Sequence, residues 1–150
     1  MAQVDSYLNQ HFTRERPGRF QEVVDTALND SDKTFTCPAG ELWELSFVYV
    51  DYTATVDQGN RLLIMEAYDT AEVIGLTTAL NVQAAGTAEY YHFGVPYTTA
   101  TEDNAGYHFV PMPVRWLPAG FSLRVADFND VAVAADDMIV RFLVNAYHIN

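Results

Sequence analysis

Histidine could most directly supply a metal ligand or a general base, and the sequence contains four of them. They are far apart in the chain, form no His-x-His pair, and have no glutamate at the spacing of an enzymatic cupin's metal site. A functional site needs several groups that converge, so each histidine is expected to be structural. The four are His11, His92, His108 and His148. The sequence therefore predicts no metal site and no cofactor.

The nucleophilic side chains also lack a catalytic signature. No Gly-x-Ser-x-Gly motif and no glycine-rich phosphate loop occur, and the single cysteine, Cys37, lies in no local signature of a thiol enzyme. Cys37 stands beside the turn residue Pro38 in apolar surroundings, which is typical of an inert, partly buried thiol. We therefore expect that the protein is not an enzyme.

Carboxylates gather in one late segment of the chain. Asp127, Asn129 and Asp130 are followed closely by Asp136 and Asp137, and oxygen ligands of this kind could hold calcium. Their spacing, however, is not that of an EF-hand, and Asp and Asn very often cap turns. We favour a solvated acidic turn, and ion binding stays open as the alternative.

Aromatic side chains are the remaining candidates for a binding surface. Flat rings can stack on pyranose faces, so a sugar-binding surface is one interpretation. Packing in the core or between subunits is the commoner use of such residues. The residues concerned are Tyr90, Tyr91, Tyr97, Tyr107 and Trp116. From this group we predict that Tyr90, Tyr91 and Trp116 contribute to a subunit interface.

Length and composition limit the class of protein. A chain of 150 residues with 49% hydrophobic content fits one domain that buries its own core without disulfides or metal. The formal net charge of -12 and the single lysine, Lys33, argue against nucleic acid as a partner, because phosphate binding needs clustered basic residues. No apolar run is long enough for a membrane helix, and the N-terminus lacks the order of a signal peptide. We expect a soluble protein, made in the cytoplasm, that binds neither nucleic acid nor membrane.

The N-terminal residues 1–19 differ from the rest of the chain in charge. They hold three arginines against two acidic residues, a net charge of +1, which leaves -13 for residues 20–150. One interpretation is a loosely ordered terminus, and the other is an extended arm that docks on an acidic neighbour through arginine forks. On the second interpretation, the docking residues are Tyr7, Phe12, Arg14, Arg16 and Arg19.

Alternating apolar residues predict the central strands. The segment 37–53 opens with a Cys-Pro-Ala-Gly turn and continues as a strand with alternating apolar residues. The segment 117–125 resembles it without being a true repeat. A last strand follows at 136–146. Between Phe20 and about Asn29 the apolar residues follow helical spacing instead, which predicts a short helix.

Seven or eight short strands with few helices predict an all-β fold. We expect an antiparallel β-sandwich with the topology of a jelly roll, and an open barrel is the main alternative. The predicted organisation is an arm at 1–19 and a single sandwich domain at 20–150 that begins with the short helix. The strongly apolar C-terminal strand would be sticky at a sheet edge, which favours an oligomer.

Turns and strand starts between about residues 35 and 145 follow a recurring order: Trp43, Tyr52–Thr55, Gly59–Leu62, Pro113, Leu117–Gly120, Leu123–Val125 and Asp136–Met138. This order resembles the head decoration, or cement, class of small virion proteins in tailed bacteriophages. The resemblance implies a non-enzymatic protein, often a trimer, that binds the outer face of an icosahedral head and clamps neighbouring major capsid subunits. The alternatives are a tail or neck component of the virion, and a carbohydrate-binding or adhesion module.

Overall fold

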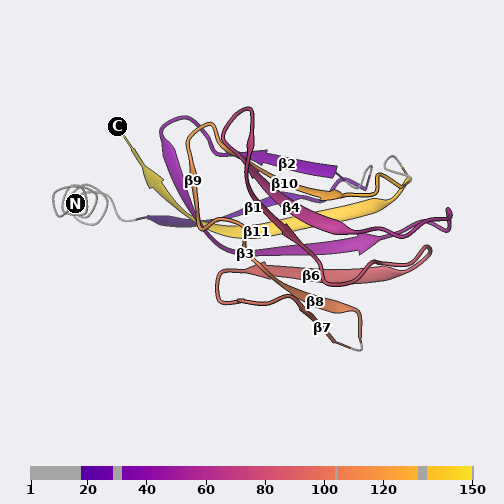
Figure 1. The fold of residues 1–150 in the computed structure, drawn as a ribbon. Helices are drawn as coiled ribbons and strands as arrows, with labels where there is room; N and C mark the ends of the chain where they lie inside the picture. The colour runs from indigo at the N-terminus through magenta and orange to yellow at the C-terminus, as the bar shows by residue number, and fades with distance from the viewer. Residues whose placement is uncertain (1–17, 29–31, 104, 132–134, 150) are drawn as a thin grey trace.

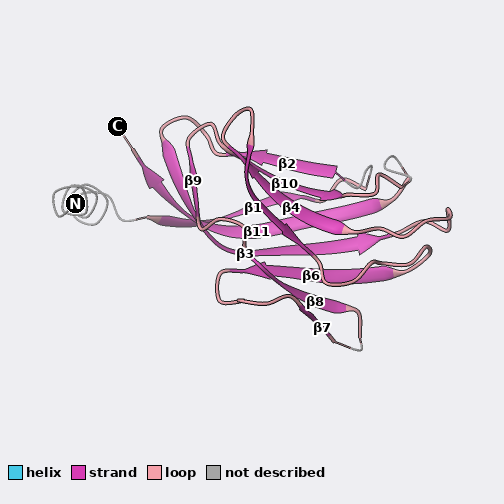
Figure 2. Ribbon diagram, viewed as in Figure 1, coloured by secondary structure: helices cyan, strands magenta, loops and turns pink. Residues whose placement is uncertain are grey.

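The structure is a computed structural model that describes residues 18–28, 32–103, 105–131 and 135–149. These residues form strands and loops without a helix, and the strands make two sheets (Figures 1 and 2). The larger sheet has the order β1 (Arg19–Asp25), β11 (Asp137–His148), β3 (Glu41–Thr53), β6 (Ala88–Gly94), β8 (Tyr107–Pro111) and β7 (Thr101–Glu102), with β9 (Trp116–Pro118) also paired to β3. The smaller sheet has the order β2 (Asp32–Thr36), β10 (Ser122–Asp127), β4 (Leu63–Tyr68) and β5 (Val73–Thr78).

The two sheets share one apolar core, as expected for a β-sandwich. Along β11 the predicted inward positions from Met138 to Ala146 are buried, while the residues between them are more exposed. The ring of Phe35 in β2 meets the ring of Phe142 in β11 edge to face, with centroids 4.9 Å apart. The alternation of period 2 therefore places one side of each sheet inside the molecule.

The two predicted turns lie side by side. Gly40 and Gly120 each adopt a positive φ, 79° and 81°, which glycine reaches without a Cβ clash. Cys37 donates its backbone N–H to Phe121 O at 2.9 Å, and Gly120 donates to Cys37 O at 2.9 Å. Burial raises the pKa of the Cys37 thiol to about 11, which fits the inert thiol expected from the sequence.

The prediction of a helix between Phe20 and Asn29 is wrong. Residues Arg19–Asp25 form β1, which pairs antiparallel with β11 from Arg19↔Ala146 to Asp25↔Val140. The β-branched Val23 and Val24 suit a strand, and the edge of β11 offers backbone hydrogen bonds that a short isolated helix could not match. Phe20 and Val24 point away from the core and are exposed, so their helical spacing did not mark a buried face.

Candidate functional site: the aromatic face of the larger sheet

Aromatic side chains cover part of the outer side of the larger sheet. They come from β3, β6 and β8 and from the loop after β6, and the strand register places them beside one another. We call the following residues the aromatic face: Phe47, Tyr49, Tyr90, His92, Tyr97, Tyr107 and Phe109. Each ring contacts at least one other ring of the set, so the face is continuous across the strands.

Five of the seven rings of the aromatic face are stacked on a neighbouring ring: Tyr49, Tyr90, His92, Tyr107 and Phe109. The planes of Tyr49 and Tyr90 differ by 13° with centroids 6.3 Å apart, and Tyr107 follows at 4.9 Å and 25° from Tyr90. His92 and Phe109 are stacked at 5.5 Å and 21°. Offset stacking of this kind is favourable. Tyr97 instead meets the rings of Phe47 and Phe109 edge to face, at 68° and 67°.

The aromatic face is only partly shielded from water. Phe47 is 44% exposed and Tyr107 36% exposed. Burial by the neighbouring rings nevertheless lowers the pKa of His92 below its ordinary value, and burial together with the charge of Asp51 raises the pKa of Tyr49. Burial also raises the pKa of Asp51. The surface therefore already disfavours charge before any partner covers it.

Two shallow hollows flank Phe47. One, of about 270 Å³, is lined by residues including Tyr49, Arg141 and Leu143, and the other, of about 210 Å³, includes Val95. Both are open to solvent and mostly apolar in lining. A ridge between two open hollows is a shape that a protein surface can fill, whereas small-molecule sites are more deeply concave.

The outer side of the smaller sheet has the opposite character. Arg124 on β10 donates to Asp32 Oδ2 from Nη2 at 2.7 Å and to Glu66 Oε2 from Nη1 at 2.9 Å. The hydroxyl of Tyr68 donates to the same Glu66 oxygen at 2.7 Å. These charged groups are paired within the chain and hydrated at their edges, so this face needs no partner to be complete.

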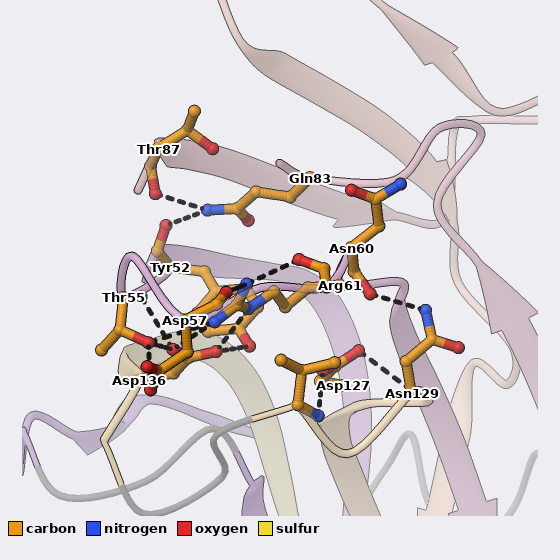
Figure 3. A network of polar contacts seen from close by, with 12 residues as sticks. Tyr52, Thr55, Asp57, Asn60, Arg61, Gln83, Thr87, Asp127, Asn129 and Asp136 are labelled. Carbon is orange, nitrogen blue, oxygen red and sulfur yellow. Dashed lines mark hydrogen bonds and ion pairs between the residues drawn. The ribbon is translucent and has the colours of Figure 1, made fainter. Parts of the chain in front are cut away.

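A buried polar network closes the end of the sandwich where β3 ends and β11 begins (Figure 3). Arg61 and Asp136 are both fully buried and form a two-bond pair, Nε to Oδ2 at 2.8 Å and Nη2 to Oδ1 at 3.0 Å. Tyr52 and Thr55 also donate to Asp136. Nη1 of Arg61 donates to the carbonyl oxygens of Asp57 and Gly59. This network ties loops together and leaves no open group for chemistry.

The late acidic segment uses its carboxylates within the protein. Asp127 accepts backbone N–H groups of Leu62, Asn129 and Val131. Burial by itself raises the pKa of Asp136, but the hydrogen bonds from Arg61, Thr55 and Tyr52 outweigh it and lower the pKa overall. In the described part of the chain no group of three or more His, Cys, Asp or Glu side chains could hold a metal ion. Asp127 caps a turn, but the prediction of a solvated acidic turn is wrong for Asp127 and Asp136. Both are buried, at 2% and 0% exposure, and their carboxylates accept hydrogen bonds within the protein.

The structure separates the residues that the sequence grouped as an interface. Tyr90 belongs to the aromatic face, whereas Tyr91 is fully buried and donates its hydroxyl to Gln83 Oε1 at 3.0 Å. Trp116 is 44% exposed but lies near the other end of β3, 5.9 Å from the ring of Tyr147. The side chain of Tyr91 lies on the inner side of β6 and has no exposed surface for a subunit contact.

Of the five predicted docking residues of the arm, only Arg19 is within the described chain. It is the first residue of β1 and donates to Gln21 Oε1 at 2.8 Å, while Tyr7, Phe12, Arg14 and Arg16 lie outside the described residues. Just before β1, Gly18 packs so closely on Asn145 that a Cβ there would collide with the amide side chain. Gly18 thereby fixes where the chain enters the sheet edge.

Sequence reasoning missed part of the aromatic face. Phe47, Tyr49, His92 and Phe109 were not grouped with Tyr90 and Tyr107. A signal was present in strand parity, because Tyr90 and His92 alternate with Tyr91 and Phe93. The parallel pairing of β6 with β8, which brings Phe109 next to His92, has no local sequence signal.

Comparison with known proteins leaves the family open. No family model and no curated protein matches the chain. Among solved structures, the chain is similar to a chain of the cyanophage Pam1 capsid asymmetric unit, with 14% identity, 89% and 87% of the two chains covered and a TM-score of 0.39. A turnip yellow mosaic virus chain has 8% identity, 91% and 82% coverage and a TM-score of 0.35. PfGH50B has 9% identity and a TM-score of 0.37, and the 93% of this chain that aligns spans 23% of that protein. Scores and identities this low do not decide the function of this chain.

No helix long and apolar enough to cross a membrane occurs in the residues that the structure describes.

Proposed function

We propose that the chain is a non-enzymatic structural protein of a virion, specifically a head decoration protein that binds the outside of an icosahedral shell and strengthens contacts between major capsid subunits. The observation that carries this proposal is the strand order. The larger sheet contains the run β1-β11-β3-β6, and the smaller sheet has the order β2-β10-β4-β5. We interpret these two orders as an eight-stranded jelly roll with β7, β8 and β9 as an insertion before β10.

Jelly rolls serve in viral capsid domains, in lectins and in cupins. An enzymatic cupin needs histidines that converge on one metal site. Here His92 lies on the outer face, whereas His108 is buried and pairs with Glu89 at 2.6 Å, so the cupin alternative lacks support. A lectin needs ring faces open to stack on sugars, and five rings of the aromatic face already use a face to stack on a neighbouring ring. The capsid alternative needs a rigid sandwich with surfaces for neighbours, and the aromatic face is such a surface.

The proposal assigns two contact surfaces. The arm, with Tyr7, Phe12, Arg14, Arg16 and Arg19, would bind the shell, since its charge of +1 contrasts with -13 for the remainder. The aromatic face, including Tyr90, would pack against a neighbouring subunit, with Trp116 as a separate contact near the arm's entry point. A closed trimer on the virion's outer surface is the assembly that the sequence resemblance implies.

The test of shell binding is co-sedimentation with undecorated heads at physiological salt. The full chain should sediment with the heads and raise their melting temperature. The triple variant Arg14→Ala, Arg16→Ala, Arg19→Ala should lose binding, whereas Arg115→Ala, which removes an exposed arginine paired with Glu44, should bind normally. Heads that neither capture the chain nor gain stability would contradict the decoration role. Unaltered binding by the triple variant would contradict only the role of the arm.

A second candidate function is carbohydrate binding, and the exposure of Trp116 favours it. Arg115 lies over one side of this indole at 5.8 Å, which leaves a partly open ring beside a charged donor. A glycan panel tests the idea. Binding that Trp116→Ala abolishes would support a sugar site, and an absence of binding across the panel would remove it.

A further inference from the structure

The outermost strands of the two sheets differ in how they are protected against pairing with another chain. An edge strand exposes unpaired backbone N–H and C=O groups, and proteins block such edges with charges, prolines, bulges or short length. In the larger sheet, β1 carries Arg19, Glu22 and Asp25, and β7 has only two residues. In the smaller sheet, β2 carries Asp32 and Lys33. Three of the four edges are therefore protected.

The fourth edge, β5, has none of these protections along most of its length. Its sequence is Val-Ile-Gly-Leu-Thr-Thr, and residues 73–88 contain no charged residue and no proline, the longest uncharged run in the sequence. Val73, Ile74 and Leu76 are 46%, 48% and 55% exposed. Within the described residues, β5 pairs only with β4, and its register shifts only near Val73. The edge from Gly75 to Thr78 is regular, apolar and open.

The position of β5 is fixed from its inner side. A Cβ on Gly75 would lie 2.9 Å from Val114 Cγ1 and 3.1 Å from Pro113 O, so the insertion before β10 presses directly on the strand backbone. Leu76, which pairs with Glu66 of β4, has the outward parity. The edge is thus preorganised for a partner strand, and this lowers the ordering cost of pairing.

We propose that β5 pairs antiparallel with β5 of a second copy of this chain, joining two four-stranded sheets into one. Charge identifies the occupant. A basic partner would find no carboxylate along residues 73–88, and at a net charge of -12 two copies repel each other wherever their acidic surfaces meet. A second copy can approach the uncharged edge at the least electrostatic cost. The second copy also supplies an identical apolar strand for the pairing. A two-fold contact places the same residues on both sides.

This contact concerns the free chain and does not depend on shell binding. The experiment is size-exclusion chromatography with light scattering over a dilution series, with Leu76→Lys as the variant and Val56→Lys as its matched control. Val56 is 86% exposed and lies in the loop between β3 and β4. Leu76→Lys brings two like charges together across the paired strands and should raise the dissociation constant at least about tenfold. The Val56→Lys variant should keep the mass of the unmodified chain.

A second measurement separates strand pairing from side-chain contact. Amide hydrogen exchange of residues 73–78 should be slowed at high concentration in the unmodified chain and should speed up in Leu76→Lys, because pairing protects backbone N–H groups. A chain that is monomeric at every concentration would overturn the proposal. A trimer whose mass Leu76→Lys leaves unchanged would also overturn it, as would exchange at β5 that does not depend on concentration. Failure of shell binding in the sedimentation test would leave the proposal standing.

Discussion

The buried network around Arg61 places charged side chains in the interior, and the aromatic face places large apolar rings at the surface. The two regions differ in whether contacts within the chain satisfy these side chains. In the network, charged groups lie at zero exposure, yet the guanidinium and the carboxylate of Asp136 bind each other and several loop groups. On the aromatic face, large rings stay in contact with water, and Phe47 and Tyr107 are among the exposed residues. The first region is complete within one chain, so its role is structural. The second leaves apolar surface open, which is typical of an interaction site.

The largest effect is expected from breaking the buried pair. Asp136→Asn removes the charge that balances Arg61, and breaking a buried pair in this way costs about 3–5 kcal/mol of unfolding free energy. The adjacent carboxylate supplies a matched control, because Asp137→Asn should change the unfolding free energy by less than about 0.5 kcal/mol. Urea denaturation followed by fluorescence measures both values. Equal losses in the two variants would show that the network is not specific to Asp136.

A smaller loss of stability, with a larger loss of association, is expected on the aromatic face. The double variant Tyr90→Ala, Tyr107→Ala removes one stacked pair, worth about 0.5–1.5 kcal/mol beyond area burial. Its assembly with neighbouring subunits on heads should weaken at least about tenfold. The neighbouring side chain of Tyr91 lies in the core. The variant Tyr91→Ala should therefore lower the free energy of unfolding by about 3–5 kcal/mol. Normal assembly by the double variant, in the same sedimentation assay, would remove the aromatic face from the interface.

The sequence was sufficient for elements whose signal is local. The strands at 41–53 and 137–148 follow from apolar residues at every second position, and the turns at Pro38 and Pro118 follow from proline and glycine chemistry. The all-β class follows from these elements. The order of the strands within the two sheets does not, because several strand orders satisfy the same alternation.

The sequence was insufficient where distant residues decide the structure. Residues 19–25 have helical spacing of apolar residues, but the open edge of β11 recruits them as a strand. All four residues from Tyr90 to Phe93 carry rings, so both sides of β6 have aromatic side chains. Strand parity alone therefore does not tell which of the two sides lies in the core. Arg61 and Asp136 are 75 positions apart in sequence, and nothing in either local segment marks the other as its partner.

Acid should weaken the buried network once Asp136 becomes protonated. The folded pKa of Asp136 lies below the unfolded value because the hydrogen bonds from Arg61, Thr55 and Tyr52 outweigh the effect of burial. Its contribution to stability is therefore complete above the unfolded pKa of about 4 and is lost as the pH falls through the folded pKa. Thermal melts between pH 7 and 3 should show a steeper loss for the unmodified chain than for Asp136→Asn. Parallel pH profiles would contradict this assignment.

The smallest effect is expected from His92, and it distinguishes the two regions at milder pH. Burial among Tyr49, Tyr107 and Phe109 lowers the pKa of His92, so the neutral ring is favoured and its stabilising effect is complete above the unfolded pKa of about 6.5. As the pH falls through the lower folded pKa, a charge enters the aromatic face and should weaken any contact that covers it. His92→Phe keeps a ring in the stack and removes the titration, so its assembly between pH 7 and 5 should stay constant while that of the unmodified chain declines. A decline of equal size in both proteins would place the sensitive group outside the aromatic face.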